Sequence, residues 1–284
     1  IKYLVAYFGS SIFMEEENNR EDKQIIADIV AGQTSEEVIQ HLNNPVTDLN
    51  PIVKHYLTAV KGVKKEGNKF YFSDGSARVE VRVVSDEIIR VRLAPHGVFL
   101  TDFSYAVEVV DQKVTTFRLE EYDDYYSIST NTITCKVNKE DFLVSFIDNL
   151  TGIVMSQDSQ PMHWEENVEF GGFYVFGTKK CLPEENFFGL GDKSGNMNLR
   201  GRKFQNWNTD AYSFGWDQDP LYRTIPFYIG IHQAASYGIF FDNTFRSYFD
   251  FGKENNDKTS FWADGGELQY YYIHGPHMMD VLKR

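Results

Sequence analysis

The feature that most constrains the fold is an alternation of apolar and charged residues that starts after about residue 60. Residues 78–83 read Arg-Val-Glu-Val-Arg-Val, and residues 89–93 read Ile-Arg-Val-Arg-Leu after a Ser-Asp-Glu turn at 85–87. Successive side chains of a strand point to opposite faces. The pattern therefore predicts an antiparallel hairpin with one dry face and one wet face.

Other short runs have strand character and are separated by turn residues. They lie at 105–110, 115–119, 126–130, 133–137, 143–148, 172–179, 227–232, 237–241, 246–251 and 268–274. Many short strands with few long helices predict an all-β sandwich. Only the beginning of the chain differs, because residues 20–31 and 34–42 have helical periodicity and capping signals. We expect residues 1–58 to be a helical or irregular appendage and residues 59–274 to be the sandwich.

Composition excludes several classes of partner. The chain has 28 basic and 41 acidic residues, a net charge of −13. Binding to nucleic acid needs clustered Lys and Arg, and an anionic membrane surface attracts the same residues, so neither partner is expected. No apolar run approaches the roughly 20 residues of a membrane span. The first residues lack a basic lead and a cleavage site, so no signal peptide is predicted there, and cytoplasmic, periplasmic and secreted locations all fit.

A long polar segment at 184–226 is the strongest functional candidate. It is too long for a hairpin connection, yet it contains Trp207, Trp216 and several carboxylates, among them Asp210. Long ordered loops are usually functional. Carboxylates beside indole rings suit a sugar, because the oxygens accept hydrogen bonds from hydroxyls and the ring covers an apolar sugar face. A loop that is simply packed by its own aromatic residues remains the alternative.

No metal or cofactor is predicted. The acids at 210, 217 and 219 do not have the spacing of an EF-hand. The histidines at 232, 274 and 277 lack paired ligand spacing, and the chain has no Gly-x-Ser-x-Gly elbow, no P-loop and no GxGxxG motif. The two cysteines, Cys135 and Cys181, are expected to be buried thiols.

Several motifs occur in one order along residues 60–284. They are Phe-Gly-Leu-Gly-Asp-Lys-Ser-Gly at 188–195, Arg-Gly-Arg at 200–202, Trp-Asn-Thr-Asp-Ala at 207–211, Asp-Pro-Leu-Tyr at 219–222, Ile-Pro-Phe at 225–227, Tyr-Gly-Ile-Phe-Phe-Asp-Asn at 237–243 and Gly-Gly-Glu-Leu at 265–268. Together they resemble glycoside hydrolase family 31, the α-glucosidase and α-xylosidase family. The Trp-Asn-Thr-Asp form is most similar to the α-glucosidase branch.

The resemblance implies a galactose-mutarotase-like antiparallel β-sandwich that precedes a (β/α)8 barrel. In the family the barrel carries an Asp nucleophile and an Asp acid/base, so no catalytic residue is expected in this chain. Residues 275–284 resemble the linker into the barrel. Retaining hydrolysis needs two carboxyls about 5–5.5 Å apart. We therefore expect this chain alone to be inactive, with its own barrel and an α-linked oligosaccharide or glycoside as partners; a homo-oligomer is also compatible with the sequence.

One family role transfers by position. Asp210 matches the Asp with which a sandwich loop of α-glucosidases binds sugar hydroxyls near the point of cleavage. Trp207, Tyr212 and Trp216 are neighbouring candidates for a stacking wall, without residue-level support from the family. The family often has Asp at the position of Gln269. We expect the loop to be exposed and poorly supported, and an apolar patch to mark the docking surface of the barrel.

Two alternatives from other functional classes stay open. The first is a carbohydrate-binding sandwich that works by itself. The second is a mutarotase-like epimerase, which needs a His and a carboxylate that converge on a pyranose ring oxygen. His232 and His274 are the strand-borne histidines available for that role.

Overall fold

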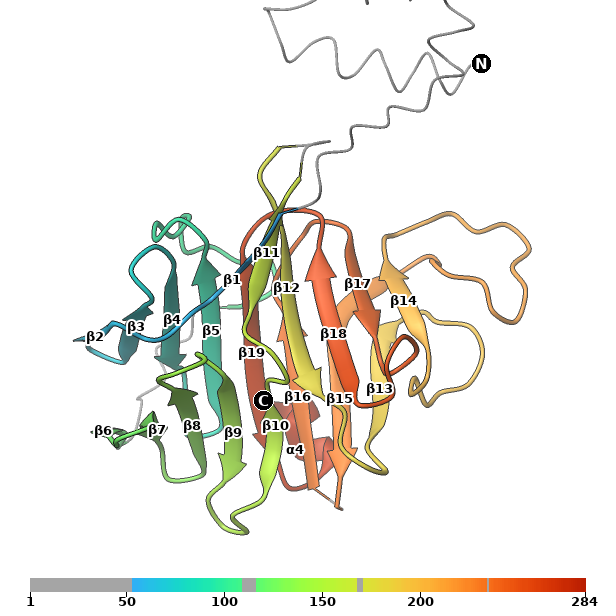
Figure 1. Cartoon of the computed structure of the whole chain (residues 1–284). Helices are drawn as coiled ribbons and strands as arrows, with labels where there is room; N and C mark the ends of the chain where they lie inside the picture. Colours follow the sequence, from blue (N-terminus) through green and yellow to red (C-terminus); the bar gives the residue numbers. More distant parts are fainter. Residues whose placement is uncertain (1–52, 109–115, 168–170, 234) are drawn as a thin grey trace, which may run out of the picture. The chain divides into compact units, whose positions relative to one another are not determined.

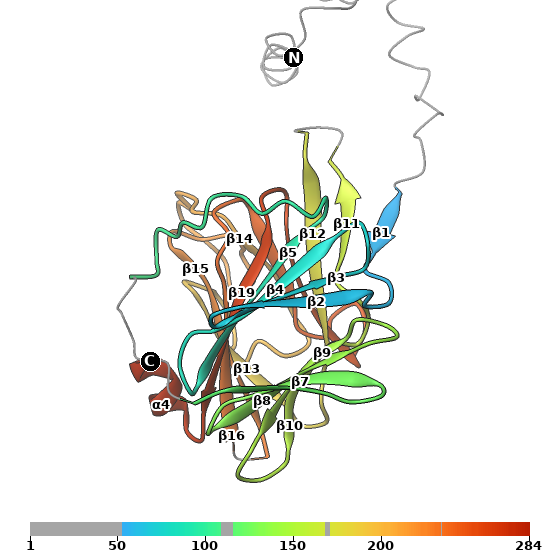
Figure 2. The same ribbon diagram turned by 90° about the vertical axis from the view of Figure 1, so that its left-hand side faces the viewer.

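A computed structural model describes residues 53–108, 116–167, 171–233 and 235–284. The helices predicted at 20–31 and 34–42 lie outside these residues. The described part is one compact unit that runs from Val53 to Arg284. Its strands form three antiparallel sheets, which pack as two layers (Figures 1 and 2). The prediction of an all-β antiparallel sandwich is confirmed.

One layer is an eight-stranded sheet. Its strands, in spatial order, are β13 (Asn186–Gly191), β15 (Thr224–His232), β16 (Ala235–Phe241), β19 (Leu268–Gly275), β5 (Ile88–Ala94), β4 (Arg78–Val83), β3 (Lys69–Ser73) and β2 (Gly62–Glu66). The predicted hairpin of residues 78–93 is the β4–β5 pair, in which Val81 lies opposite Val91.

The other layer consists of two smaller sheets. The six-stranded sheet has the order β1 (Lys54–Tyr56), β11 (His163–Glu166), β12 (Phe173–Lys180), β18 (Lys258–Ala263), β17 (Ser247–Asp250) and β14 (Lys203–Asn206). The five-stranded sheet has the order β10 (Val154–Gln157), β9 (Val144–Asp148), β8 (Ile133–Asn138), β7 (Tyr125–Ser129) and β6 (Arg118–Glu121).

Alternation along the strands builds the core between the layers. Phe146 of β9 stacks on Tyr272 of β19 with ring centroids 4.1 Å apart. Phe249 of β17 meets Phe241 of β16 edge to face at 6.2 Å. All four rings are fully buried. Aromatic side chains bury large areas and prefer such offset or edge geometries, so they join each smaller sheet to the large one.

A buried ion pair lies in this apolar core. Lys179 of β12 donates to Asp158 Oδ1 at 2.5 Å and to the hydroxyl of Tyr270 on β19 at 2.8 Å. The second oxygen of Asp158 accepts from the backbone amide of Val144 at 2.9 Å. Burial raises the pKa of the Asp158 carboxyl, and the adjacent Lys179 ammonium opposes that rise. A buried charge is tolerated when it is paired and its other lone pairs are satisfied, as they are here.

The prediction of a wet face on the β4–β5 hairpin is wrong. Glu80, Arg90 and Arg92, which the alternation places on the outer face, are only 2–3% exposed. They are covered by the segment of residues 98–108, hereafter the strap, which crosses the outer face of β5. Asp102 of the strap accepts from Arg90 Nη1 at 2.5 Å, so the charged face is buried beneath ion pairs rather than water.

Two other expectations about the strands need correction, and eight strands were not expected. Residues 105–108 of the predicted strand at 105–110 are not a strand, because Ser104 Oγ accepts from the amides of Ala106 and Val107 at 3.1 Å and turns the chain. The strand expected at 115–119 is β6, which starts only at Arg118. Strands β1, β2, β3, β10, β11, β13, β14 and β18 were not predicted.

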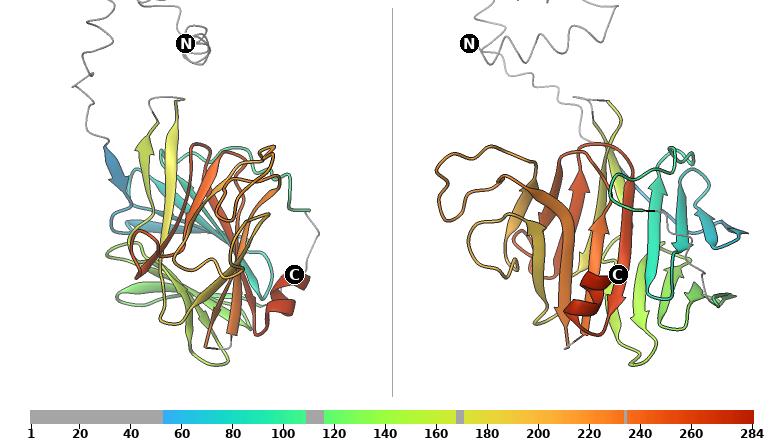
Figure 3. Two further views of the ribbon diagram at one scale, coloured as in Figure 1. Left: turned by 90° about the vertical axis from the view of Figure 1, so that its right-hand side faces the viewer. Right: turned by 180° about the vertical axis from the view of Figure 1, so that it is seen from behind.

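The described part ends in a short helix. This helix, α4 (Met278–Lys283), lies on the outer face of the eight-stranded sheet, away from the smaller sheets (Figure 3). Its Val281 is buried against Gly238 and Gly275, where a Cβ atom would lie within 2.8 Å of the Val281 side chain. Met279 and Leu282 remain more than half exposed. None of the described helices has the length and apolar character that a membrane crossing demands.

Replacing Lys179 by Met should destabilise the sandwich by about 3–5 kcal/mol, because Asp158 is then a buried charge without a partner. Urea unfolding measures the change. An unpaired buried carboxyl favours its protonated form, so the loss should be smaller at pH 5 than at pH 8. Lys180→Met is the control, since Lys180 is exposed on the same strand and should change stability by less than about 0.5 kcal/mol. Equal losses for the two variants would contradict the role of the ion pair.

Candidate functional site

The predicted loop at 184–226 is not one loop. It contains β13 and β14, and β15 begins at Thr224. The prediction of one loop is wrong because Phe187 and Phe204 are buried core residues, and the segments that contain them pair as strands of the sheets. Two longer stretches remain outside the strands, residues 192–202 and residues 207–223. The second, hereafter the projecting loop, leaves β14 and extends away from the sheets (Figures 1 and 3).

A buried ion pair holds the base of the projecting loop. The Asp219 carboxylate accepts from Lys193 Nζ at 2.7 Å and from the amide of Gln205. Lys193 Nζ also donates to the carbonyl of Gln205 at 2.7 Å. Burial lowers the pKa of Lys193, and the Asp219 carboxylate counteracts that effect. The two ends of the loop are therefore tied to β14 and to each other.

Further contacts continue from the base toward Asp210. The amide of Thr209 donates to the carbonyl of Leu221 at 3.0 Å, and the hydroxyl of Tyr222 donates to the carbonyl of Ala211. Ala211 and Leu221 are buried. The expectation of a poorly supported loop is thus wrong for the base, because residues on both sides of Asp210 are fixed by hydrogen bonds and burial.

The four predicted sugar-contacting residues lie along the projecting loop. Asp210 is exposed, and Trp207 is 46% exposed with the Arg246 guanidinium 4.8 Å from its ring centroid. Tyr212 and Trp216 belong to the tip and are 95% and 70% exposed. The structure thus presents all four to solvent, with Asp210 and Trp207 near the fixed base and the other two on the free tip.

A cavity of about 420 Å³ lies beside Trp207, at the end of the sandwich where β14 and β16 end and β15 and β17 begin. Its wall includes Tyr105, Asn206, Asn208, Asp242 and Phe245. The sequence gives none of these residues a role in one site, because they come from the strap, from two sheets and from the β16–β17 turn. Asn208 and Asp242 stand there only within family motifs.

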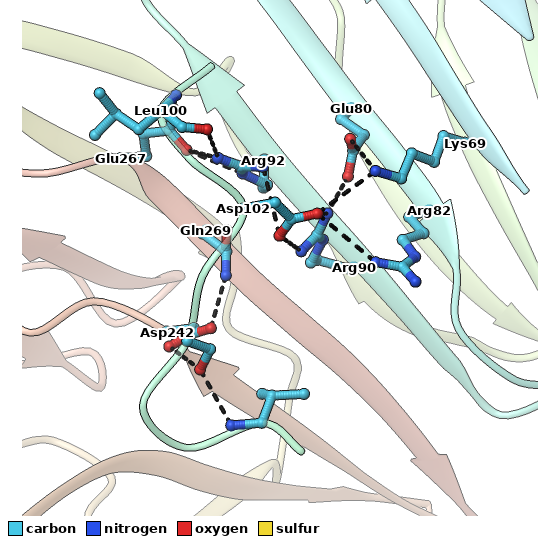
Figure 4. A network of polar contacts seen from close by, with 12 residues as sticks. Lys69, Glu80, Arg82, Arg90, Arg92, Leu100, Asp102, Asp242, Glu267 and Gln269 are labelled. Atoms are coloured by element: carbon cyan, nitrogen blue, oxygen red, sulfur yellow. Dashed lines mark hydrogen bonds and ion pairs between the residues drawn. The ribbon is translucent and has the colours of Figure 1, made fainter. Parts of the chain in front are cut away.

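Charged side chains hold the strap next to the cavity (Figure 4). Arg92 pairs with Glu267, whose Oε1 accepts from the amide of Leu100 at 2.5 Å. The Arg90 hydrogen bond is the largest of the effects that lower the pKa of Asp102. Phe103 and Tyr105 are 64% and 84% exposed on this strap.

Gln269 connects this network to the cavity. Its Nε2 donates to Asp242 Oδ2 at 2.6 Å, while Ser104 Oγ donates to Asp242 Oδ1 at 2.9 Å. Burial raises the pKa of Asp242, and these two donors counteract the rise. An Asp at position 269 would place two carboxyls against one another, whereas Gln supplies a donor. The strand expected around Gln269 is present as β19.

The residues considered for other chemistry do not converge. Among the residues that the structure describes, no group of three or more His, Cys, Asp or Glu side chains is placed to hold a metal ion. His274 is buried, with Nδ1 3.3 Å from the Tyr272 hydroxyl, and neither it nor His232 lines the cavity beside Trp207. Cys135 and Cys181 are buried free thiols, as expected.

Comparison with known proteins agrees with this architecture. Residues 78–250 match the family described as the glycosyl hydrolase 31 N-terminal galactose mutarotase-like domain. Alpha-glucosidase 2 of Bacillus thermoamyloliquefaciens is 30% identical over 217 residues, which are 76% of this chain and 27% of that protein. Alpha-xylosidase XylQ of Lactiplantibacillus pentosus is 38% identical over 147 residues, 51% of this chain and 18% of that protein.

The fold has a counterpart among solved structures. The Flavobacterium johnsoniae GH31 dextranase FjDex31A, complexed with isomaltotriose, superposes with a TM-score of 0.73 at 31% identity. The match covers 81% of this chain and 28% of the dextranase chain. The chain thus spans about a quarter or less of the length of these relatives.

Asp219→Asn should loosen the projecting loop, because Lys193 loses its counter-charge in a site where only 4% of its side chain is exposed. The expected loss of stability is about 1–3 kcal/mol, with faster hydrogen exchange at the Gln205 amide. Asp217→Asn is the matched control: this carboxylate is 80% exposed and 3.6 Å from Arg202, so less than about 0.5 kcal/mol should be lost. Unchanged exchange at Gln205 in Asp219→Asn would refute the anchoring role.

Proposed function

The chain belongs to glycosyl hydrolase family 31 as an N-terminal galactose mutarotase-like domain, and from this premise we propose that it serves a retaining α-glycosidase of the α-glucosidase type. The substrates are terminal α-linked sugars. Support comes from the alpha-glucosidase, alpha-xylosidase and dextranase named above, which are related along most of the sandwich. The single observation that carries the proposal is the position of Asp210, exposed on a loop whose base is fixed.

In this proposal Asp210 binds substrate and performs no bond cleavage. A carboxylate accepts hydrogen bonds from two neighbouring hydroxyls, and such charge-assisted bonds orient a sugar strongly. Holding the substrate in one orientation lowers the entropy cost of the reaction. Trp207 near the base, and Tyr212 and Trp216 on the tip, supply apolar surface for sugar faces. The catalytic pair of carboxyls, about 5–5.5 Å apart in retaining enzymes, is assigned to a barrel outside this chain.

The partner in this proposal is that barrel, with residues 275–284 as the connection to it. The outer face of the eight-stranded sheet is the docking surface. It presents Phe103 and Tyr105 of the strap, and Met279 and Leu282 of α4, all more than half exposed. These residues lie on the face of the large sheet that is turned away from the smaller sheets. This face therefore takes no part in the core between the layers. Exposed apolar residues on the face that is turned away from the core suit a domain interface.

In the complete enzyme, Asp210→Ala should lower kcat/KM for maltose and isomaltose by about 1–3 kcal/mol of transition-state stabilisation, the size of a lost charge-assisted hydrogen bond. Steady-state kinetics measures the change. Asp217→Ala, which removes a carboxylate from the exposed tip of the same loop, should change kcat/KM much less. Unchanged kinetics of Asp210→Ala with several disaccharides would remove Asp210 from the site.

The 284-residue chain by itself should not hydrolyse p-nitrophenyl α-glucoside, because the proposal places both catalytic carboxyls elsewhere. The release of nitrophenolate over hours, at high protein concentration, provides a sensitive assay. Turnover that copurifies with the chain would show that the catalytic carboxyls lie within it.

A further inference from the structure

One side chain of the projecting loop is hydrogen-bonded to the large sheet. Asn208 lies two positions before Asp210, and its Oδ1 accepts from the amide and from the hydroxyl of Thr224, both at 2.9 Å. A carbonyl oxygen has two lone pairs, so these bonds use its full acceptor capacity. The backbone N–H of Thr224 can only donate, so the oxygen of Asn208, and not its nitrogen, must face it. The contact therefore requires an acceptor at position 208.

The partner of Asn208 belongs to the sheet and not to the loop. Thr224 is the first residue of β15, and it lies opposite Gly191 of β13 in the eight-stranded sheet. The strand before the loop, β14, belongs to the six-stranded sheet, and no ladder joins β14 to β15 within the described part of the chain. The Asn208 side chain thus connects the two layers at a place where the backbone ladders do not.

The other hydrogen bonds beside Asp210 lie within the loop itself. The amide of Thr209 donates to the carbonyl of Leu221 at 3.0 Å. The hydroxyl of Tyr222 donates to the carbonyl of Ala211. These bonds hold the outgoing and the returning part of the loop together. The bonds from Asn208 to Thr224 add a fixed point in the large sheet.

The Asp210 side chain depends on this support from its backbone. Asp210 is exposed, and its carboxylate has no hydrogen-bond partner among residues 53–108, 116–167, 171–233 and 235–284. No contact of the carboxylate itself therefore sets its position. A side chain that orients a substrate must be held within a fraction of an ångström by the residues around it. Asn208 supplies such a support two positions away.

We propose that Asn208 is a positioning residue of the enzyme. Its amide oxygen fixes the segment that carries Asp210 to the first residue of β15, and it thereby sets where the Asp210 carboxylate meets the sugar. Asn208 makes no contact with the substrate in this role. The role rests on the proposed function, because it acts through Asp210. The hydrogen bonds from Asn208 to Thr224 do not rest on it, since they are contacts within the chain.

Hydrogen exchange of the Thr224 amide in the 284-residue chain tests these bonds without any catalysis. Asn208→Leu removes the acceptor at similar size, so the Thr224 amide should exchange about fivefold faster or more. Asn208→Asp keeps an acceptor of the same shape, and its Thr224 amide should exchange no faster than in wild type. Asn196→Leu is the control, because this exposed side chain has no hydrogen bond within the described residues. A wild-type exchange rate in Asn208→Leu would overturn the proposal.

A double-mutant cycle in the complete enzyme tests whether Asn208 acts through Asp210. Asn208→Leu should lower kcat/KM for maltose and isomaltose about five- to tenfold, because a displaced carboxylate orients the sugar poorly. The same substitution in an Asp210→Ala enzyme should change kcat/KM less than about twofold, since no carboxylate is left to be positioned. Asn208→Asp should keep kcat/KM within about threefold of wild type, because the acceptor is retained.

Three kinetic results would overturn the role of Asn208 alone, each in an enzyme that Asp210→Ala impairs. The first is wild-type kinetics of Asn208→Leu. The second is an equal fold loss from Asn208→Leu with and without Asp210, which indicates an independent effect. The third is an equal loss in Asn208→Leu and Asn208→Asp, which shows that the acceptor is not what matters. Unchanged kinetics of Asp210→Ala is a separate outcome, because it would overturn the proposed function together with this role.

Discussion

The three sheets of the sandwich meet at one buried ammonium group. Lys179 extends from the six-stranded sheet, pairs with Asp158 beside the five-stranded sheet and donates to Tyr270 of the large sheet. Apolar contacts alone are non-directional and tolerate small shifts between sheets. A desolvated charge does not tolerate such shifts, because only one arrangement satisfies all its partners. The ion pair therefore constrains how the three sheets are placed where they meet in the core.

On the outer face of the large sheet, charged side chains are again buried with the help of ion pairs. Alternation turns Arg90, Arg92 and Glu80 outward, and the strap then buries them beneath Asp102 and its neighbours. Asp102 of the strap pairs with these buried charges and is itself 37% exposed, while Phe103 and Tyr105 of the strap are 64% and 84% exposed. These exposed rings suit the barrel interface that we propose, in a domain whose match covers about a quarter of the relatives' length.

The sequence predicted the strands in which apolar and polar residues alternate, because this period of two shows that one face is buried. It missed strands such as β14, Lys-Phe-Gln-Asn, whose extended form comes from pairing with β17 rather than from local preference. Among the candidate site residues it singled out Trp207 and Asp210, which are close along the chain. It did not find that Tyr105 and Asp242 join them, since they meet Trp207 only through the fold, across about half of the chain. The prediction of a wet face was wrong for a related reason. The strap that covers this face has no periodic sequence pattern from which its position could be predicted.

The projecting loop has a fixed base and an exposed tip, and Asp210 lies next to the fixed part. Asp210 precedes the buried Ala211 directly, and Thr209 before it is bonded to Leu221, so its backbone has little room to move. Residues 212–218 are all exposed and lie beyond these anchors. A side chain that orients a substrate must be held within a fraction of an ångström by its support. The support that makes this placement precise is the Lys193–Asp219 pair at the base, which contacts no sugar in the proposed arrangement.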